Sequence, residues 1–254
     1  MGLVRLVYNA WQQVQRRADF ERLCLANDIA LELSENIADL TILKEIFEAR
    51  VYADYFPFYQ KATVLDIGAH KGYFSLFALK NLDPQSRIIA VEPYASHVEI
   101  LKKNLILNDG VQVQVLAAGL SDRSGQAQLH IAQSENHSLF PKHSSLLKRQ
   151  RPFESVTVQV YALKDLLAEL QLERVDFLKM DCEGAEYPAL LAADAETLSK
   201  IGAISLEFHD LKDARYTGLE LAKFLSGHGF TIAKLQHAAT TINNNFGYLM
   251  ALRS

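Results

Sequence analysis

Acidic and basic side chains late in the chain have the types and spacing of acid–base catalysts. Asp181 and Glu183 follow one short apolar run, and Glu207 and His209 end another. If both runs are parallel strands, their carboxyl ends meet at one edge of a sheet, where such folds bind ligands. Carboxylate and imidazole groups there could remove the proton of an alcohol, and an imidazole titrates near neutral pH. Asp181, Glu183, Glu207 and His209 are therefore the candidate catalytic residues.

Some of these roles have alternatives, and so does the involvement of a metal. A histidine after a strand is as often a structural hydrogen-bonding residue as a catalyst, which leaves both roles open for His209. Glu183 suits orienting a substrate, a cofactor amine or the following helix, and helix capping is the alternative for Glu183 and Glu186. Asp181, Glu207 and His209 could also hold a divalent cation, although histidine is an unusual partner in a magnesium site built from oxygens. We favour proton removal without a metal, and the sequence leaves the metal content undetermined.

A glycine-rich turn earlier in the chain has the features of a cofactor cradle. Residues 66–72 read Asp-Ile-Gly-Ala-His-Lys-Gly and place Gly68 and Gly72 between a predicted strand and a predicted helix. Glycines there let the backbone approach a ligand, and the exposed amides of the helix N-terminus point toward it. Glu92 comes twenty residues after Gly72, at the end of the next predicted strand, where a carboxylate accepts hydrogen bonds from two ribose hydroxyls. Turn and acid together indicate a nucleoside cofactor.

The spacing of the two glycines bears on the class of cofactor. A dinucleotide enzyme usually shows Gly-x-Gly-x-x-Gly for its pyrophosphate, whereas three other residues separate Gly68 from Gly72. The turn therefore suits a cofactor without a diphosphate. A nicotinamide dehydrogenase on a similar sheet and a non-catalytic binding protein with this fold are the alternatives.

The segments that must position these residues alternate between strand and helix. Short apolar runs predict strands at residues 61–67, 87–91, 111–117, 175–180 and 203–208, and a closing antiparallel pair at 230–235 and 248–252. Apolar residues at helical spacing follow several of these runs, for example from Phe74 to Leu79. The alternation predicts an α/β fold with a mostly parallel sheet that helices cover on both faces.

Two further alternating segments surround a long irregular stretch. Residues 127–131 and 155–160 predict added strands around an insert at 133–155, which is rich in serine, histidine and basic residues. So polar a segment does not suit a core, and long loops in compact domains are often functional. We expect the insert to be a lid over the active site, with a solvated loop as the alternative.

Composition and charge exclude several classes of protein. Apolar residues make up 49% and charged residues 22% of the chain, which fits a folded domain rather than a disordered or fibrous one. The net charge of −4 offers no general attraction for a phosphate backbone, so we expect no nucleic-acid partner. Two cysteines, Cys24 and Cys182, are too few for a disulfide scaffold, which predicts free thiols and a cytoplasmic setting.

The first residues of the chain predict an amphipathic helix. Leu3, Val7, Ala10 and Val14 form an apolar stripe, but Arg5 interrupts the segment and no cleavage site follows, so it is a poor signal peptide. Such a helix could lie on an anionic membrane, whereas a helix packed on its own domain is the commoner arrangement and the one we favour. The stretch is too short to span a bilayer, so we expect no stable membrane insertion.

Residues 177–186 carry the most specific motif of the chain. They read Phe-Leu-Lys-Met-Asp-Cys-Glu-Gly-Ala-Glu and closely resemble the hallmark Lys-x-Asp-x-Glu-Gly-Ala-Glu segment of the FkbM-family methyltransferases. Turn 66–72 resembles the S-adenosylmethionine turn of class I methyltransferases, with His70 in place of the middle glycine. The resemblance runs from about residue 45 to the C-terminus and also covers 64–78, 91–93, 119–122, 162–167 and 207–209.

The resemblance implies a fold, an activity and a set of binding residues. The implied fold is a Rossmann-like seven-stranded methyltransferase sheet, mostly parallel with an antiparallel C-terminal strand. The implied activity is S-adenosylmethionine-dependent O-methylation of a hydroxyl of a small molecule, a glycan or another natural product. The residues expected to bind S-adenosylmethionine are Asp66, Gly68, Ala69, His70, Gly72, Tyr73, Glu92, Pro93, Leu120 and Asp181.

The expected organisation is a helical cap followed by one larger domain. We predict that residues 1–60 form the cap and that residues 61–254 form the methyltransferase domain with its insert. The sequence leaves the oligomeric state and the acceptor undetermined.

Overall fold

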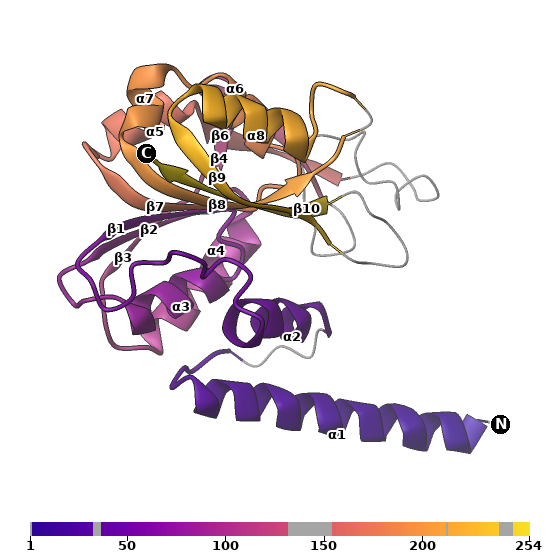
Figure 1. Ribbon diagram of the computed structural model, residues 1–254. Helices are drawn as coiled ribbons and strands as arrows, with labels where there is room; N and C mark the ends of the chain where they lie inside the picture. The colour runs from indigo at the N-terminus through magenta and orange to yellow at the C-terminus, as the bar shows by residue number, and fades with distance from the viewer. Residues whose placement is uncertain (1, 33–36, 132–153, 212, 239–245) are drawn as a thin grey trace.

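One sheet of seven strands organises the molecule (Figure 1). The structure is a computed structural model and describes residues 2–32, 37–131, 154–211, 213–238 and 246–254. In the order in which they lie side by side, the strands are β3 (Val113–Leu116), β2 (Arg87–Val91), β1 (Thr63–Ile67), β7 (Val175–Met180), β8 (Ile201–His209), β10 (Phe246–Arg253) and β9 (Phe230–His237). Neighbours from β3 to β8 are parallel, whereas β10 runs antiparallel to β8 and β9. The predicted sheet is therefore confirmed, with each of its seven predicted strands in place.

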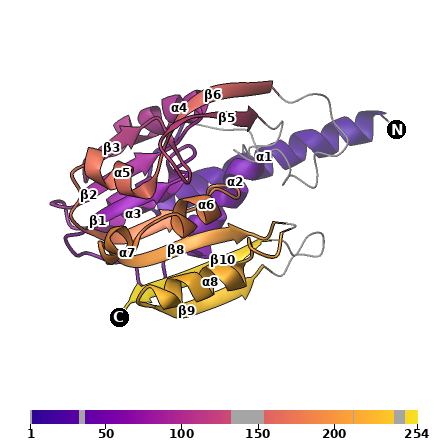
Figure 2. The same cartoon turned by 90° about the horizontal axis from the view of Figure 1, so that it is seen from above.

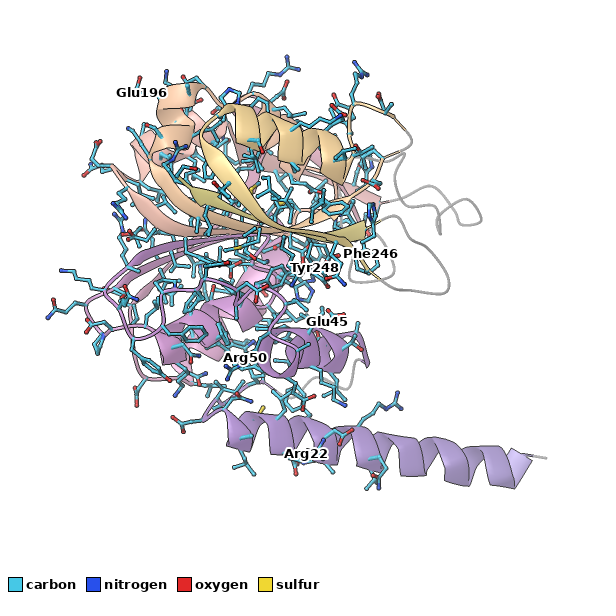
Figure 3. The ribbon with its side chains drawn as sticks, viewed as in Figure 1. Arg22, Glu45, Arg50, Glu196, Phe246 and Tyr248 are labelled. Carbon is cyan, nitrogen blue, oxygen red and sulfur yellow. The ribbon has the colours of Figure 1, made fainter. Side chains whose placement is uncertain are left out.

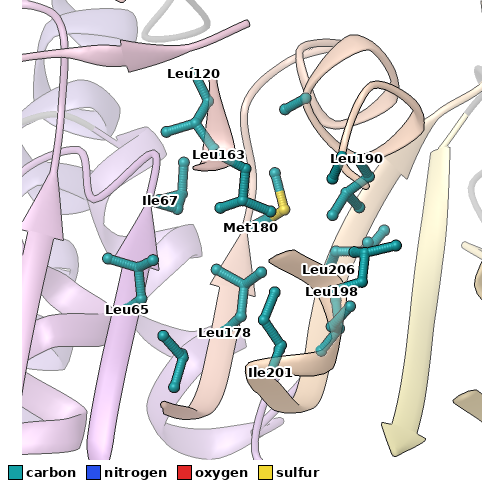
Figure 4. Packing of buried hydrophobic residues seen from close by; sticks show 14 of the residues in the cluster. Leu65, Ile67, Leu120, Leu163, Leu178, Met180, Leu190, Leu198, Ile201 and Leu206 are labelled. Carbon is teal, nitrogen blue, oxygen red and sulfur yellow. The ribbon is translucent and has the colours of Figure 1, made fainter. Parts of the chain in front are cut away.

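The central strands are mostly apolar because helices cover both faces of the sheet. One face carries α5 (Leu163–Glu169), α6 (Glu186–Leu191), α7 (Ala195–Ser199) and α8 (Gly218–Gly227), and the other carries α3 (Tyr73–Asn81) and α4 (Ala95–Ile106) (Figure 1). Figure 4 shows the core on the first face, where Leu178 and Met180 of β7 pack with Leu163 of α5 and Leu190 of α6. All four side chains are almost completely buried.

The N-terminal segment, which comprises the residues before β1, packs against α3, on the face of the sheet that carries α3 and α4. It contains α1 (Gly2–Ala26), α2 (Ile37–Leu43) and a π-helical turn, η1 (Lys44–Glu48). Phe20 of α1, Leu43 of α2 and Phe47 of η1 are buried in one cluster with Phe74 and Phe77 of α3. Within the described residues, no helix has both the length and the hydropathy to cross a membrane. The division into a cap of residues 1–60 and a larger domain stays a prediction.

Polar contacts fasten this segment to the sheet domain. The side chains of Asn104 and Asn108, on and just after α4, bond to the backbone of residues 30–32 at 2.7 to 2.9 Å. The Lys71 ammonium lies 2.9 Å from both carboxylate oxygens of Asp39 in α2, and both side chains are buried. Since Lys71 belongs to the glycine turn, this ion pair connects α2 directly to the predicted cofactor cradle.

A second, smaller sheet contains the added strands. It has the order β4-β6-β5, from β4 (Gly119–Leu120), β6 (Glu154–Tyr161) and β5 (Gly125–Ile131). Figure 2 shows β5 and β6 at the edge of the molecule, away from β9 and β10. The strands predicted on either side of the insert are confirmed. The insert at 133–155, and with it the predicted lid, lies outside the described residues except for the start of β6.

Candidate functional site

A pocket opens at the carboxyl ends of the parallel strands, where the sequence predicted a ligand site. Its volume is about 1020 Å³, part of which is open to solvent, and described residues from both the sheet domain and the N-terminal segment line it. The predicted site residues that line it are Gly68, Ala69, His70, Tyr73, Glu92, Pro93, Leu120, Asp181 and Glu183. Asp66, Gly72, Glu207 and His209 are not part of this lining.

The turn after β1 brings the backbones of β1 and β7 very close together. Gly68 has a φ of +71°, and a Cβ atom there would overlap the carbonyl oxygen of Asp181, so only glycine fits. Gly72 has a φ of +87°, and its Cβ would lie 3.0 Å from the side chain of Leu101 in α4. Both glycines thus shape the cradle. Gly68 lies in the pocket wall, whereas Gly72 lies outside the lining and packs against α4.

A buried lysine supports this turn from behind. The Lys179 ammonium donates to the Gly68 carbonyl oxygen at 2.9 Å and lies 3.2 Å from the Asp66 carboxylate. Ser75 donates to the other oxygen of Asp66 at 2.7 Å, and Asp66 is fully buried. Burial alone would lower the pKa of Lys179, but Asp66 and Asp181 outweigh it and raise the pKa, which keeps the ammonium charged. Asp66 therefore stabilises the turn through Lys179 instead of facing the pocket.

Glu92 ends β2 with its carboxylate in the pocket wall. One oxygen accepts the backbone amide of His70 and the other accepts that of Tyr94, both at 2.9 Å. His97 Nδ1 lies 3.6 Å from the same carboxylate. Burial alone would raise the pKa of Glu92, but these donors outweigh it and lower the pKa, so the group is ionised. Oε1 faces both Tyr94 and His97, whereas Oε2 accepts, among the described residues, only the His70 amide and, because a carboxylate oxygen has two lone pairs, keeps one for a further donor.

Asp181 and Glu207 lie at the ends of neighbouring parallel strands and share one donor. In the register of β7 and β8, Met180 lies opposite Leu206, which places the following residues side by side. The Tyr52 hydroxyl lies 3.0 Å from Asp181 Oδ2 and 3.3 Å from Glu207 Oε2. This tyrosine comes from the N-terminal segment and is 5% exposed.

Carboxylates surround the imidazole of His209. Its Nδ1 lies 3.1 Å from Glu186, and its Nε2 lies 3.5 Å from Glu183 and 3.4 Å from Glu207. Glu186 is fully buried and also accepts the backbone amides of Gly184 and His209, so it holds the ring in place. Burial alone would lower the pKa of His209, but the carboxylates outweigh it and raise the pKa well above its ordinary value. The imidazole is therefore positively charged at neutral pH.

Two glutamates of the pocket titrate near neutral pH. Burial raises the pKa of Glu183 to about 7, with the charges of Asp181 and Glu207 adding to the shift and that of His209 opposing it. Burial, Glu207 and Asp181 also raise the pKa of Glu45 in η1 to about 7. Figure 3 shows Glu45 on the side of the sheet where Tyr248 lies. The acidic end of the pocket thus holds more carboxyl groups than can ionise together.

The acid cluster fits both chemical arrangements that the sequence suggested. Asp181, Glu207 and His209 each offer a ligand atom, and these atoms lie within 4.8 Å of one another, a spacing that suits one cation. The same groups also satisfy one another through the Tyr52 hydroxyl and the charged imidazole. Proton removal and a shared cation are both compatible with these distances.

The N-terminal segment supplies part of the pocket that the sequence analysis did not assign to a site. Ile42, Glu45, Ile46 and Tyr52 line the pocket beside the sheet residues. No motif marks these residues, because their contribution depends on how α2 and η1 pack below α3. The one signal in the sequence was that the family resemblance begins at about residue 45, well before the first strand.

Comparisons with known proteins agree with the site. The family model described as the methyltransferase FkbM domain matches residues 66–232. Methyltransferase 1 of Beauveria bassiana is 31% identical over 206 residues, which cover 76% of this chain and 81% of that protein. The 31-O-demethyl-FK506 methyltransferase FkbM of Streptomyces tacrolimicus is 25% identical over 77% of this chain and 83% of its own length. The AMB antimetabolite synthetase AmbE of Pseudomonas aeruginosa is 31% identical over 78% of this chain, which spans only 11% of AmbE.

A solved structure shares the fold. The magnesium protoporphyrin IX methyltransferase of Synechocystis PCC 6803, with bound S-adenosylhomocysteine, matches with a TM-score of 0.51 and 11% identity over 98% of this chain and 100% of that one. The match to the family model includes the glycine turn, Glu92 and the acid cluster, and it favours methyl transfer over the dehydrogenase and non-catalytic alternatives. The chain therefore belongs to the FkbM methyltransferase family and is an S-adenosylmethionine-dependent methyltransferase.

Proposed function

We propose that this enzyme methylates a hydroxyl group of a small molecule, a sugar or another natural product. The observation that carries the proposal is the acid cluster at the end of the pocket, because an alcohol must lose a proton to become a methyl acceptor. Asp181 lines the pocket, and Glu207 and His209 stand directly beside it. The name of the Streptomyces relative, which specifies an O-methyltransferase substrate, supports the same acceptor chemistry.

The residues of the cradle fit S-adenosylmethionine, which supplies an electrophilic methyl group on a sulfonium. We assign the binding of its ribose hydroxyls to Glu92, whose Oε2 accepts one protein donor and keeps a lone pair for a ribose hydroxyl. Gly68 suits close approach of the backbone, since even a Cβ atom does not fit at this position. Pro93 and Leu120 line the same pocket and provide apolar surface there. We retain Ala69, His70 and Tyr73 as further contacts because they line the same pocket.

Within this proposal, the charges of the acidic and basic groups support different roles for them. A charged imidazole cannot accept a proton, so we assign proton removal to Asp181 and assign His209 to holding Glu183 and Glu207 in place. Glu183 lines the pocket and suits contact with the acceptor. Most of the rate of an in-line displacement comes from alignment of the reacting groups, so this positioning matters as much as the base.

A mass-spectrometric screen of sugars and polyketides for the gain of one methyl group tests the proposal. With an acceptor from the screen, Asp181→Asn and His209→Ala are each expected to lower turnover by ~10²-fold or more, with most of the S-adenosylhomocysteine affinity kept. Asp109→Asn, which changes an exposed aspartate, is the matched control. If neither variant lowers turnover, the roles assigned to Asp181 and His209 are both wrong.

A chelation experiment separates the two forms of the mechanism. We expect activity to survive exhaustive chelation, because Tyr52 and His209 already satisfy the two carboxylates. Loss of turnover on chelation and its recovery with Mg²⁺ would replace direct proton removal by metal-assisted activation of the hydroxyl.

A further inference from the structure

Tyr52 reaches the acid cluster from outside the part of the chain that matches the family model. That match begins at residue 66, whereas Tyr52 lies in the segment between η1 and β1. Its hydroxyl lies within hydrogen-bonding distance of Asp181 and of Glu207. The contact therefore joins the N-terminal segment to the ends of β7 and β8.

The surroundings of the ring fix where this hydroxyl lies. The ring makes edge-to-face contacts with Phe74 and Tyr248, with centroid distances of 5.8 Å and 6.0 Å. The Lys179 ammonium lies 5.3 Å from the ring centroid on a third side. Lys179 is itself held by Asp66 and by the backbone of the glycine turn. A ring enclosed in this way has little freedom to point its hydroxyl elsewhere.

The Tyr52 hydroxyl has one hydrogen for two carboxylates, and Glu207 also faces the His209 imidazole. A phenol has one O–H donor, so it donates to Asp181 or to Glu207 at any moment, and Asp181 is the nearer of the two. Hydrogen bonds to a charged acceptor are stronger than neutral ones and hold the acceptor's orientation. Removal of the donor would free the Asp181 carboxylate to rotate away from the pocket or from Glu207.

We propose that Tyr52 is a positioning residue, whose hydroxyl holds the Asp181 carboxylate in the pocket wall, where it favours a cationic ligand over a neutral ligand of the same shape. The proposal rests on the proposed function for the role of Asp181 in proton removal. The effect of Tyr52 on the preference for a cationic ligand can be measured without a methyl acceptor.

The test compares two named probes, S-adenosylmethionine, which carries a sulfonium, and S-adenosylhomocysteine, which carries a neutral thioether. Calorimetry gives a selectivity ratio, the dissociation constant of S-adenosylhomocysteine divided by that of S-adenosylmethionine. We expect Asp181→Asn to lower this ratio ~10-fold and Tyr52→Phe to lower it ~3-fold, because Tyr52→Phe weakens the placement of the charge without removing it. In the double variant, Tyr52→Phe should add almost nothing to the effect of Asp181→Asn.

Controls separate positioning from a merely structural role. Tyr187→Phe is the matched control, because the Tyr187 hydroxyl is buried and has no hydrogen-bond partner among the described residues. Tyr52→Leu is a second variant, and it should lower the ratio at least as far as Tyr52→Phe. A structural role would weaken both probes equally and leave the ratio unchanged.

Three results would overturn the proposal. They are an unchanged ratio in folded Tyr52→Phe, an equal effect of Tyr52→Phe with and without Asp181→Asn, and an unchanged ratio in Asp181→Asn itself. A failed acceptor screen would count against O-methylation alone, since the ratio is measured without an acceptor.

Discussion

Glu92 accepts protein donors on both oxygens while facing the pocket. We expect Glu92→Ala to weaken S-adenosylhomocysteine binding by about tenfold or more, since charge-assisted hydrogen bonds contribute roughly 1.5 to 3 kcal/mol each. The structure predicts a lower melting temperature as well, because the backbone amides of His70 and Tyr94 lose their acceptor.

Calorimetry and thermal unfolding of the same sample separate the two effects. Glu99→Ala removes an exposed glutamate from α4 and should change neither measurement. Unaltered affinity in a folded Glu92→Ala protein would show that the ribose assignment is wrong.

Glu45 gives a pH-dependent prediction at the residue scale. Its pKa is about 7 in the folded protein, against the ordinary value of 4.5 that applies to the unfolded chain. Between pH 4.5 and pH 7 the folded protein therefore holds a proton that the unfolded chain has lost. The stability that this proton supports is full below about pH 4.5 and is lost as the pH rises through 7. Glu45→Gln removes this loss, so its melting temperature should exceed that of the wild type by a margin that grows from pH 5 to pH 8.

A glutamate on the same helical turn provides the control. Glu48 is exposed, and Glu48→Gln should show a margin that does not change with pH. The same flat response in Glu45→Gln would show that Glu45 does not retain its proton on folding.

At the scale of elements, the contact between the glycine turn and the end of β7 leaves the least room for an added side chain. Gly68→Ala should cost more than ~4 kcal/mol of the free energy of unfolding, because the new methyl group meets the Asp181 carbonyl and the backbone has a positive φ. Gly227→Ala at the end of α8 meets no atom within 4 Å and should be tolerated. Denaturant unfolding measures both, and a small loss for Gly68→Ala would mean that the two strands can move apart.

The same elements show what the sequence could predict. Buried parallel strands such as β1 and β7 are mostly apolar runs, so pattern alone locates them within two residues. Strand β4 has only two residues, Gly119–Leu120, too few for any pattern. Tyr52 and Glu45 were missed for a different reason, since their role depends on long-range packing of the N-terminal segment. The charge on His209 was also unpredictable, because it arises from three carboxylates that only the fold brings together.

At the scale of the whole molecule, the N-terminal segment shares a core with the sheet domain. Phe74 and Phe77 of α3 are each 2% exposed, and Phe20, Phe47 and Phe56 are buried in the same cluster. Deletion of residues 1–60 would expose this apolar face. We therefore expect residues 61–254 alone to aggregate or to melt without cooperativity.

Size-exclusion chromatography and circular dichroism measure this outcome. The intact chain, measured in parallel, is the control. Cooperative melting of residues 61–254 would instead show that the N-terminal segment is an accessory to a self-sufficient domain.

The order of the strands also has a consequence for synthesis on the ribosome. Strand β8 carries Glu207 and His209, but its antiparallel partner β10 comes after β9 in the chain. A nascent chain that has emerged only as far as β8 presents that strand as an open edge, with unpaired amides and carbonyls that can pair with another chain. Tyr52 precedes Glu207 by 155 residues and is available long before. The acidic end of the pocket is thus assembled from residues that are synthesised early, such as Tyr52, and late, such as Glu207. A pause in translation between β8 and β10 is the interval in which the newly made protein is most exposed to aggregation.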